Sequence, residues 1–245
     1  MILDFQHILS NGITILSSGT TGAPKKYFQS PDKINFANLV AIESQKISKA
    51  SRIYTCCKTS HAGGLLAQTI PALSIGAHVD IEDFNAYNFI KKINYYTHSH
   101  ITPLHAKAIM LTKGFNNLNL TGITITCGAD PISWNIVESF VMKGATFICN
   151  WGMSEIGPIA INVTFDNIEK VKEYQSLTNN YSTILGDTFW CDYSIKNEQL
   201  YVRGDISIFG NDWYATNDIV SNTNNVLFYH GRKNKTIDLS VSVKG

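Results

Sequence analysis

Short apolar stretches rich in β-branched residues alternate with longer apolar or amphipathic stretches along the first 150 residues. The first kind is typical of β-strands and the second of α-helices. We expect strands at 13–16, 27–28, 52–56, 77–81, 98–101, 123–127 and 146–149. We expect helices at 31–49, 64–75, 85–95, 103–113 and 131–144. Strands separated by helices of this length predict an α/β fold with a doubly wound, mainly parallel sheet.

The pattern changes near Glu155. The stretches that follow are short and strand-like, with glycine, asparagine and aspartate between them, at 157–163, 199–203, 205–209 and 226–230. Such strands predict a smaller β-rich subdomain behind the α/β part. We therefore expect an α/β subdomain over 1–155, a β-rich subdomain over 156–230 and a hinge remnant over 231–245.

Composition narrows the classes of partner. Of 245 residues, 44% are hydrophobic and 16% are charged, which suffices for a full core. A formal net charge of +1 without long runs of like charge gives no electrostatic reason to expect nucleic acid or a membrane surface as partner. No apolar run reaches spanning length, and we expect a cytoplasmic protein. The five cysteines lack CxxC spacing, so we expect reduced thiols and no disulfide or zinc site.

The most distinctive polar stretch follows the first strand, where serines, threonines and glycines lead into Pro24, Lys25 and Lys26. Glycine allows close backbone approach, hydroxyl and N–H groups surround an anion, and a lysine supplies the charge. The spacing is not that of the Walker loop, and a polar surface turn is the alternative. The candidate phosphate-binding residues are Ser17, Ser18, Gly19, Thr20, Thr21, Gly22 and Lys25.

This stretch resembles the phosphate-binding signature of the adenylate-forming superfamily, which includes acyl-CoA synthetases, adenylation domains and luciferases. Nearly every position of the signature is matched, and further motifs follow in order. The resemblance implies ATP or AMP and Mg²⁺ as ligands, with Thr20 and Lys25 in catalytic roles. It implies a small carboxylic acid as substrate, and CoA or an acyl carrier protein as acceptor.

A second match begins at His61. His61-Ala62-Gly63-Gly64-Leu65 resembles the superfamily's His-x-x-Gly-Leu turn, in the form of the aryl- and succinylbenzoate-CoA ligases. The resemblance implies that His61 faces the ligand beside the acyl pocket and acts in catalysis. A lone histidine before an apolar helix is otherwise usually structural.

A third match is Gly128-Ala129-Asp130-Pro131, at the end of an expected strand. Small residues there let a flat ring lie against the backbone, at the edge where open α/β sheets bind ligands. The resemblance implies that Gly128, Ala129 and Asp130 hold the adenine. A plain helix N-terminus at Asp130 and Pro131 is the alternative, and both can be true.

The fourth match is Asn150-Trp151-Gly152-Met153-Ser154-Glu155, similar to the superfamily's Tyr-Gly-Met-Thr-Glu motif with Trp151 in place of tyrosine. The resemblance implies that Trp151 stacks on adenine and that Glu155 is the magnesium ligand. Magnesium that bridges phosphates needs only one or two protein oxygens, so Glu155 with the Thr20 or Thr21 hydroxyl suffices. A solvated loop acid is the alternative for Glu155.

Two further motifs lie near the end of the chain. Tyr214-Ala215-Thr216-Asn217-Asp218 resembles Tyr-x-Thr-Gly-Asp, which implies that Asp218 accepts hydrogen bonds from both ribose hydroxyls. Asn217 stands where glycine is usual, and asparagine tolerates a left-handed conformation. Gly231-Arg232 begins a hinge-like motif, with Arg232 as a ribose or phosphate contact and Lys235 at the hinge position.

Three histidines outside these motifs are candidate metal ligands. His98 and His100 share a strand face and His105 follows them closely, but no cysteine or carboxylate has convincing ligand spacing with them. We expect structural or pocket-lining roles for all three.

The leading hypothesis is a reduced adenylate-forming enzyme that converts a carboxylic acid and ATP into an acyl-adenylate and pyrophosphate. Typical members are longer at both ends, so we expect the N-terminal subdomain and the C-terminal lid with its lysine to be absent, because Lys244 follows the hinge too soon. Weak or partner-dependent activity follows, as does self-association or a partner subunit over the uncovered face. The alternatives are a non-catalytic nucleotide-binding or acyl-adenylate-binding module, one half of a split ligase, or a fragment.

Overall fold

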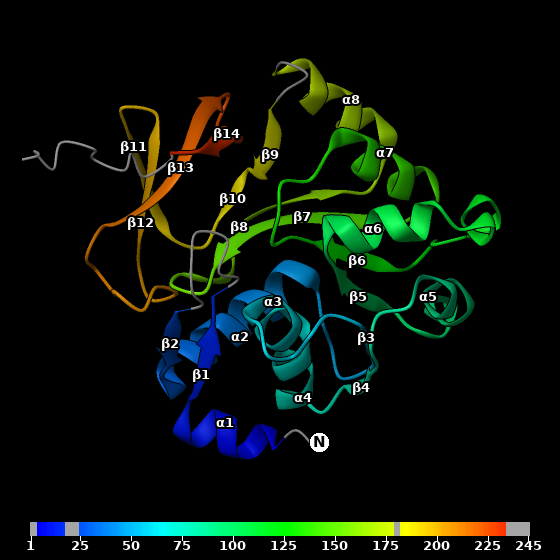
Figure 1. Ribbon diagram of the computed structural model, residues 1–245, viewed down its shortest axis with the longest axis horizontal. Helices are drawn as coiled ribbons and strands as arrows, with labels where there is room; N and C mark the ends of the chain where they lie inside the picture. Colours follow the sequence, from blue (N-terminus) through cyan, green and yellow to red (C-terminus); the bar gives the residue numbers. More distant parts are fainter. Residues whose placement is uncertain (1–3, 18–24, 179–181, 234–245) are drawn as a thin grey trace, which may run out of the picture.

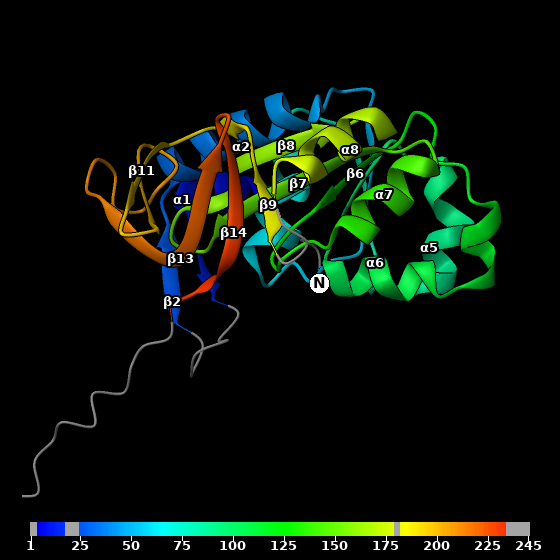
Figure 2. The same ribbon diagram turned by 90° about the horizontal axis from the view of Figure 1, so that it is seen from above.

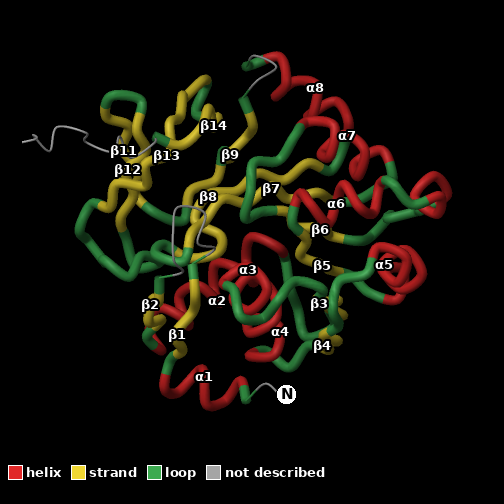
Figure 3. The backbone as a smooth tube through the Cα atoms, viewed as in Figure 1, coloured by secondary structure: helices red, strands yellow, loops and turns green. Residues whose placement is uncertain are grey.

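The computed structural model describes residues 4–17, 25–178 and 182–233. This part of the chain forms a two-stranded hairpin, a seven-stranded sheet and a five-stranded sheet (Figure 1). The five-stranded sheet and helices α5 and α6 lie at opposite ends of the molecule (Figure 3). Within the described residues, no helix is both long and apolar enough to cross a membrane.

The larger sheet has the strand order β10-β8-β7-β6-β5-β3-β4. Neighbours from β4 to β7 run parallel, while β7, β8 and β10 pair antiparallel. The strands are β3 (Arg52–Thr55), β4 (His78–Ile81), β5 (His98–Ile101), β6 (Thr124–Cys127), β7 (Thr146–Met153), β8 (Gly157–Phe165) and β10 (Thr188–Phe189). The predicted α/β fold with a mainly parallel sheet is therefore confirmed.

Helices cover both faces of this sheet (Figure 2). Neighbouring residues of β3 show this directly, because Tyr54 packs in the core with Phe89 and Ile109, whereas Ile53 packs with Ala72 on the opposite face. The first face carries α5 (Ala86–Lys92), α6 (Pro103–Met110), α7 (Trp134–Met142) and α8 (Ile168–Ser176). The other carries α2 (Pro31–Gln45) and the run α3 (Ala62–Gly64), η1 (Leu65–Thr69) and α4 (Ile70–Ser74).

The smaller sheet is entirely antiparallel, with the order β11-β12-β13-β14-β9. Its strands are β9 (Thr183–Gly186), β11 (Asp192–Lys196), β12 (Gln199–Arg203), β13 (Tyr214–Thr223) and β14 (Val226–Arg232). An apolar cluster containing Ile161 of β8 and Leu227 of β14 joins the two sheets. This shared core places the motifs of the smaller sheet against the end of the larger one.

The hairpin consists of β1 (Ile13–Leu16) and β2 (Lys26–Gln29), and Leu16 pairs with Lys26 at the end nearest the connecting segment. Helix α1 (Phe5–Asn11) precedes it and was not predicted. Helix α2 follows with the predicted caps, since the Ser30 hydroxyl accepts from the Lys33 N–H at 3.3 Å. The hairpin therefore holds Ser17 and Lys25 next to each other.

Several predicted boundaries are wrong. Helix α7 begins at Trp134 rather than Pro131, so Asp130 does not lie at a helix N-terminus. The left-handed Ala129 (φ 78°) and the extended Ser133 (φ −69°, ψ 146°) delay the helix by three residues. Residues 205–209 form turns rather than a strand, and helix α8 was not predicted. Strands β8 and β10 follow Glu155 in the chain but belong to the larger sheet.

Candidate active site

The base of the predicted phosphate loop is closed by two hydrogen bonds. The Ser17 N–H donates to the Lys25 carbonyl at 2.9 Å, and the Lys25 N–H donates to the Ser17 hydroxyl at 3.0 Å. The side chain of Ser17 is therefore engaged in holding the loop's two ends together. The other predicted loop residues lie outside the described residues: Ser18, Gly19, Thr20, Thr21 and Gly22.

The hairpin docks onto the turn that follows β7. Gln29 Nε2 donates to the Ser154 carbonyl at 3.0 Å, and the Ser154 hydroxyl donates to the Leu16 carbonyl at 3.4 Å. On its other side, the turn is held by the Ile208 N–H, which donates to the Glu155 carbonyl at 2.9 Å. Two motifs separated by more than a hundred residues in sequence are thereby brought together.

Glu155 is buried in this turn, beside the phenol groups of two tyrosines. The Tyr214 hydroxyl donates to its Oε1 at 3.3 Å, and the same carboxylate acts on the phenol of Tyr27 from β2. Burial, followed by Glu155, raises the pKa of both phenols, that of Tyr214 to about 12. The phenols therefore remain protonated at neutral pH.

Asp218 is the centre of a second cluster, in which it is 1% exposed. Arg232 Nε donates to its Oδ1 at 2.7 Å, and Trp151 Nε1 donates to its Oδ2 at 2.9 Å. The preceding Asn217 has φ 64°, the left-handed conformation that we expected asparagine to tolerate. Two predicted site residues, Trp151 of β7 and Arg232 of β14, therefore converge on the carboxylate of a third, Asp218 of β13.

Electrostatics links this cluster to its neighbours. The hydrogen bond that Arg232 donates to Asp218 raises the pKa of Arg232 above its ordinary value, and the charge of Glu155 also contributes. Burial raises the pKa of Tyr229, which also senses Asp218 and Asp130. The turns after β6 and β7 and the strands β13 and β14 thus face one common region.

The predicted adenine turn is tightly packed on one side. A Cβ at Gly128 would lie 2.5 Å from Asn150 Oδ1, so no larger residue fits there without a shift. Ala129 adopts φ 78°, and both Ala129 and Asp130 are exposed. Asn150 is buried, with Nδ2 donating to the Pro158 carbonyl at 2.6 Å. Its side chain thus braces β7 against β8.

Gly152 and Met153 complete the motif on β7. A Cβ at Gly152 would lie 2.1 Å from the Gly157 carbonyl oxygen, so the β7–β8 turn requires glycine there. Met153 pairs with Gly157 across the turn and packs in the core between the two sheets. These two residues shape the turn that presents Ser154 and Glu155.

Of the four histidines singled out in the sequence, His61 is exposed, His105 is partly buried, and His98 and His100 are buried. His61 is exposed in the N-cap position of α3. His98 is held by the Gln45 carbonyl at 3.0 Å, and His105 stacks on Phe84 with ring centroids 3.9 Å apart. His100 is buried with no hydrogen-bond partner for either ring nitrogen among the described residues, and burial lowers its pKa to about 4.

The Glu155 carboxylate suits a magnesium ion that arrives bound to a nucleotide. A buried carboxylate is the hard oxygen ligand that Mg²⁺ prefers, and phosphate oxygens and water complete such sites. Within 4–17, 25–178 and 182–233, no group of three or more histidine, cysteine, aspartate or glutamate side chains could hold a metal. Glu155 therefore fits a phosphate-bridged ion better than a metal bound by protein alone.

Three residues near the candidate site carry no signal in the sequence: Gln29, Lys33 and Tyr27. Tyr27 and Gln29 alternate with Phe28 along β2, and this period of two places them on one side of the hairpin. Their partners come from β7 and the turn after it, so no local pattern marks them. Lys33 is the buried lysine in the first turn of α2, and its ammonium donates to Gln29 Oε1 at 2.6 Å.

A family model described as AMP-binding enzyme matches residues 13–192. The chain belongs to this adenylate-forming family of ligases. It is 28% identical over 151 residues to indoleacetate–CoA ligase of Aromatoleum aromaticum, which covers 60% of this chain and 30% of that protein.

Solved structures share the fold. O-succinylbenzoate coenzyme A synthetase from Bacillus subtilis, in complex with ATP and magnesium, superposes with a TM-score of 0.72 at 19% identity. ATP-bound MatB from Rhodopseudomonas palustris gives a TM-score of 0.71 at 13% identity. The matches cover 88% and 89% of this chain and 48% and 47% of those chains. The chain thus spans about half the length of these ligases.

Proposed function

We propose that the chain binds ATP with Mg²⁺ and activates a small carboxylic acid as an acyl-adenylate. The observation that carries the proposal is the convergence of Glu155 and Asp218 on one region beside the base of the phosphate loop. One carboxylate suits a phosphate-bound cation and the other suits a ribose diol. Membership in the AMP-binding family and the ATP-bound relatives support this assignment.

The proposed reaction forms one bond and breaks another at the α-phosphorus. A carboxylate oxygen of the acid attacks the α-phosphorus, and the bond to the bridging oxygen of pyrophosphate breaks. Lys25 neutralises phosphate charge, Glu155 holds magnesium with Thr20, and Arg232 contacts ribose or phosphate. Catalysis then consists of positioning and charge neutralisation. His61 is proposed to face the acid, and CoA or a pantetheine carrier is proposed as acceptor.

Acid-dependent exchange of pyrophosphate into ATP tests this function. The purified chain is incubated with labelled pyrophosphate, ATP and a panel of aryl and alkyl carboxylic acids. Exchange above the acid-free rate with at least one acid is expected. Binding of ATP without exchange for any acid would favour the second candidate, a nucleotide-binding module or one part of a larger ligase. The half-length match to the ligase structures motivates that candidate.

Glu155→Gln tests the magnesium assignment. Glutamine keeps an acceptor for the Tyr214 hydroxyl but removes the charge, so ATP-Mg affinity should fall about tenfold or more while AMP affinity changes little. Calorimetry with each nucleotide measures both affinities. Glu82→Gln, at the far edge of the larger sheet, is the matched control and should alter neither. Equal losses of ATP-Mg and AMP affinity would refute the assignment.

A further inference from the structure

Lys33 occupies a position that general stability rules disfavour. It is 6% exposed in the first turn of α2, where the positive end of the helix dipole repels a cation. Burial lowers its pKa to about 8, and the negative charge of Glu155 opposes this shift. Burial of the ammonium at this position therefore lowers the free energy of unfolding.

No carboxylate among the described residues compensates Lys33 with an ion pair. Asp32 and Asp205 line the same surface hollow of about 540 Å³, but neither makes an ion pair with Lys33. Within the described ranges, its ammonium has one hydrogen-bond partner, the neutral amide oxygen of Gln29. A buried cation paired to a neutral amide is a poor stabilising device, which points to another role.

Gln29 connects that ammonium to the turn that carries Glu155. Its amide is 1% exposed, with Oε1 accepting from Lys33 Nζ at 2.6 Å and Nε2 donating to the Ser154 carbonyl at 3.0 Å. An amide that rotates could exchange these roles, but an ammonium only donates, so Lys33 fixes the Gln29 orientation in which Nε2 faces Ser154. The three groups form one continuous relay from α2 through β2 to the turn.

We propose that Lys33 is a positioning residue that, through Gln29, locks the phosphate-loop hairpin against the Glu155 turn. The relay sets the separation between the loop's base and the magnesium ligand before a nucleotide arrives. This inference rests on the proposed function, because the separation between the loop's base and Glu155 matters only if ATP-Mg binds between them. The relay itself exists in the free chain and is measurable there.

Hydrogen exchange of the free chain tests the relay without a nucleotide. Lys33→Met keeps the length of the side chain and removes the ammonium, so amides of 26–29 and 153–156 should exchange about tenfold faster. Lys107→Met, at an exposed lysine of α6, is the matched control and should leave both segments unchanged. Unchanged exchange of both segments in Lys33→Met would overturn the proposal, even if the chain binds ATP.

Nucleotide binding supplies the second measurement. Lys33→Met should weaken the binding of ATP-Mg about tenfold and the binding of AMP by much less, because only the triphosphate with its magnesium contacts both the loop and Glu155. Gln29→Met removes both the acceptor for Lys33 and the donor to Ser154 without adding a charge, so it should weaken ATP-Mg to a similar extent. The double variant should be no weaker than either single one. Additive losses would overturn the relay, whereas failure of the wild type to bind ATP would instead refute the proposed function.

Discussion

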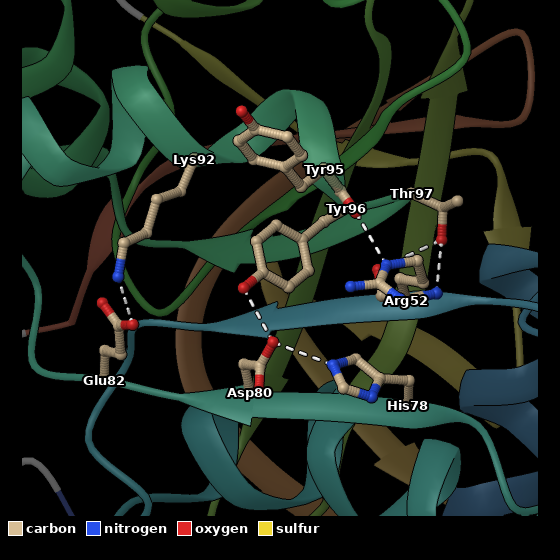
Figure 4. Close-up of polar contacts among 8 residues, drawn as sticks. All are labelled: Arg52, His78, Asp80, Glu82, Lys92, Tyr95, Tyr96 and Thr97. Carbon is tan, nitrogen blue, oxygen red and sulfur yellow. Dashed lines mark hydrogen bonds and ion pairs between the residues drawn. The ribbon is translucent and has the colours of Figure 1, made fainter.

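Two polar networks, one at the β3–β4 edge of the larger sheet and one between β7 and the smaller sheet, use similar residues with different burial. At the β3–β4 edge, Asp80 Oδ2 accepts from His78 Nε2 at 2.8 Å and from the Tyr96 hydroxyl at 2.7 Å (Figure 4). Arg52 Nε donates to the Tyr95 carbonyl at 2.8 Å in the same cluster. The His78 and Asp80 side chains are 48% and 41% exposed.

In the candidate site, a carboxylate with an equally complete set of donors is almost inaccessible to water. Asp218 is 1% exposed and depends on Trp151 and Arg232. At the edge, water replaces a lost partner, whereas a partner lost in the site leaves a charge without solvation. Hydrogen-bond geometry alone therefore does not distinguish the two networks, and burial decides what each contact contributes.

The largest expected difference follows removal of the cation beside each network. Arg232→Met leaves Asp218 without its ion pair, and the free energy of unfolding should fall by about 2 kcal/mol, since Arg232 itself is partly solvated. Arg52→Met at the edge should cost less than about 1 kcal/mol. Urea denaturation of both variants measures the contrast.

A compensating variant sharpens that test. Adding Asp218→Asn to Arg232→Met removes the uncompensated charge and should restore much of the lost stability, because a neutral amide costs less to bury. Equal losses for Arg232→Met and Arg52→Met would contradict the proposed importance of burial.

A smaller effect is expected from Trp151, whose indole N–H donates to Asp218. Trp151→Phe keeps an aromatic ring for stacking but loses this donor, so AMP affinity should fall about fivefold, the effect of a hydrogen bond of about 1 kcal/mol. Trp190→Phe is the matched control, because the Trp190 indole donates to Asn162 at 2.6 Å instead. Equal losses of AMP affinity in both variants would contradict the proposal that the Trp151 hydrogen bond to Asp218 supports nucleotide binding.

Local chemistry explains how much of the fold was predictable. The parallel strands β5 and β6 are short and largely buried, and Ser30 and Asn85 cap their helices as expected. The start of α7 was wrong because Ala129 adopts a left-handed conformation that its sequence does not announce. Helix propensity and strand pattern identify elements, whereas turn geometry and sheet membership depend on distant contacts.

The candidate site shows the same limit. The motifs around Glu155 and Asp218 are contiguous in the sequence and could be recognised there. The structure brings Trp151 and Arg232 to Asp218. The relay from Lys33 was invisible, because Gln29 and Ser154 are joined only by tertiary packing. The predicted roles of the loop residues and of His61 stay predictions. Sequence resemblance therefore located the candidate motifs but not the side chains that connect them.

The smallest expected effect is that of Asp80→Asn at the exposed edge. The hydrogen bond from Tyr96, followed by His78, lowers the pKa of Asp80 despite its partial burial. A lowered pKa means that the carboxylate stabilises the fold above the ordinary aspartate value of about 3.9, and that this contribution is lost as the pH falls through the folded value. At pH 7 the variant should lose less than about 1 kcal/mol, and the gap from wild type should close on acidification. Thermal unfolding of both chains between pH 3 and 7 measures it. A gap that exceeds the loss caused by Arg232→Met, or that widens in acid, would mean that the edge behaves as a buried network.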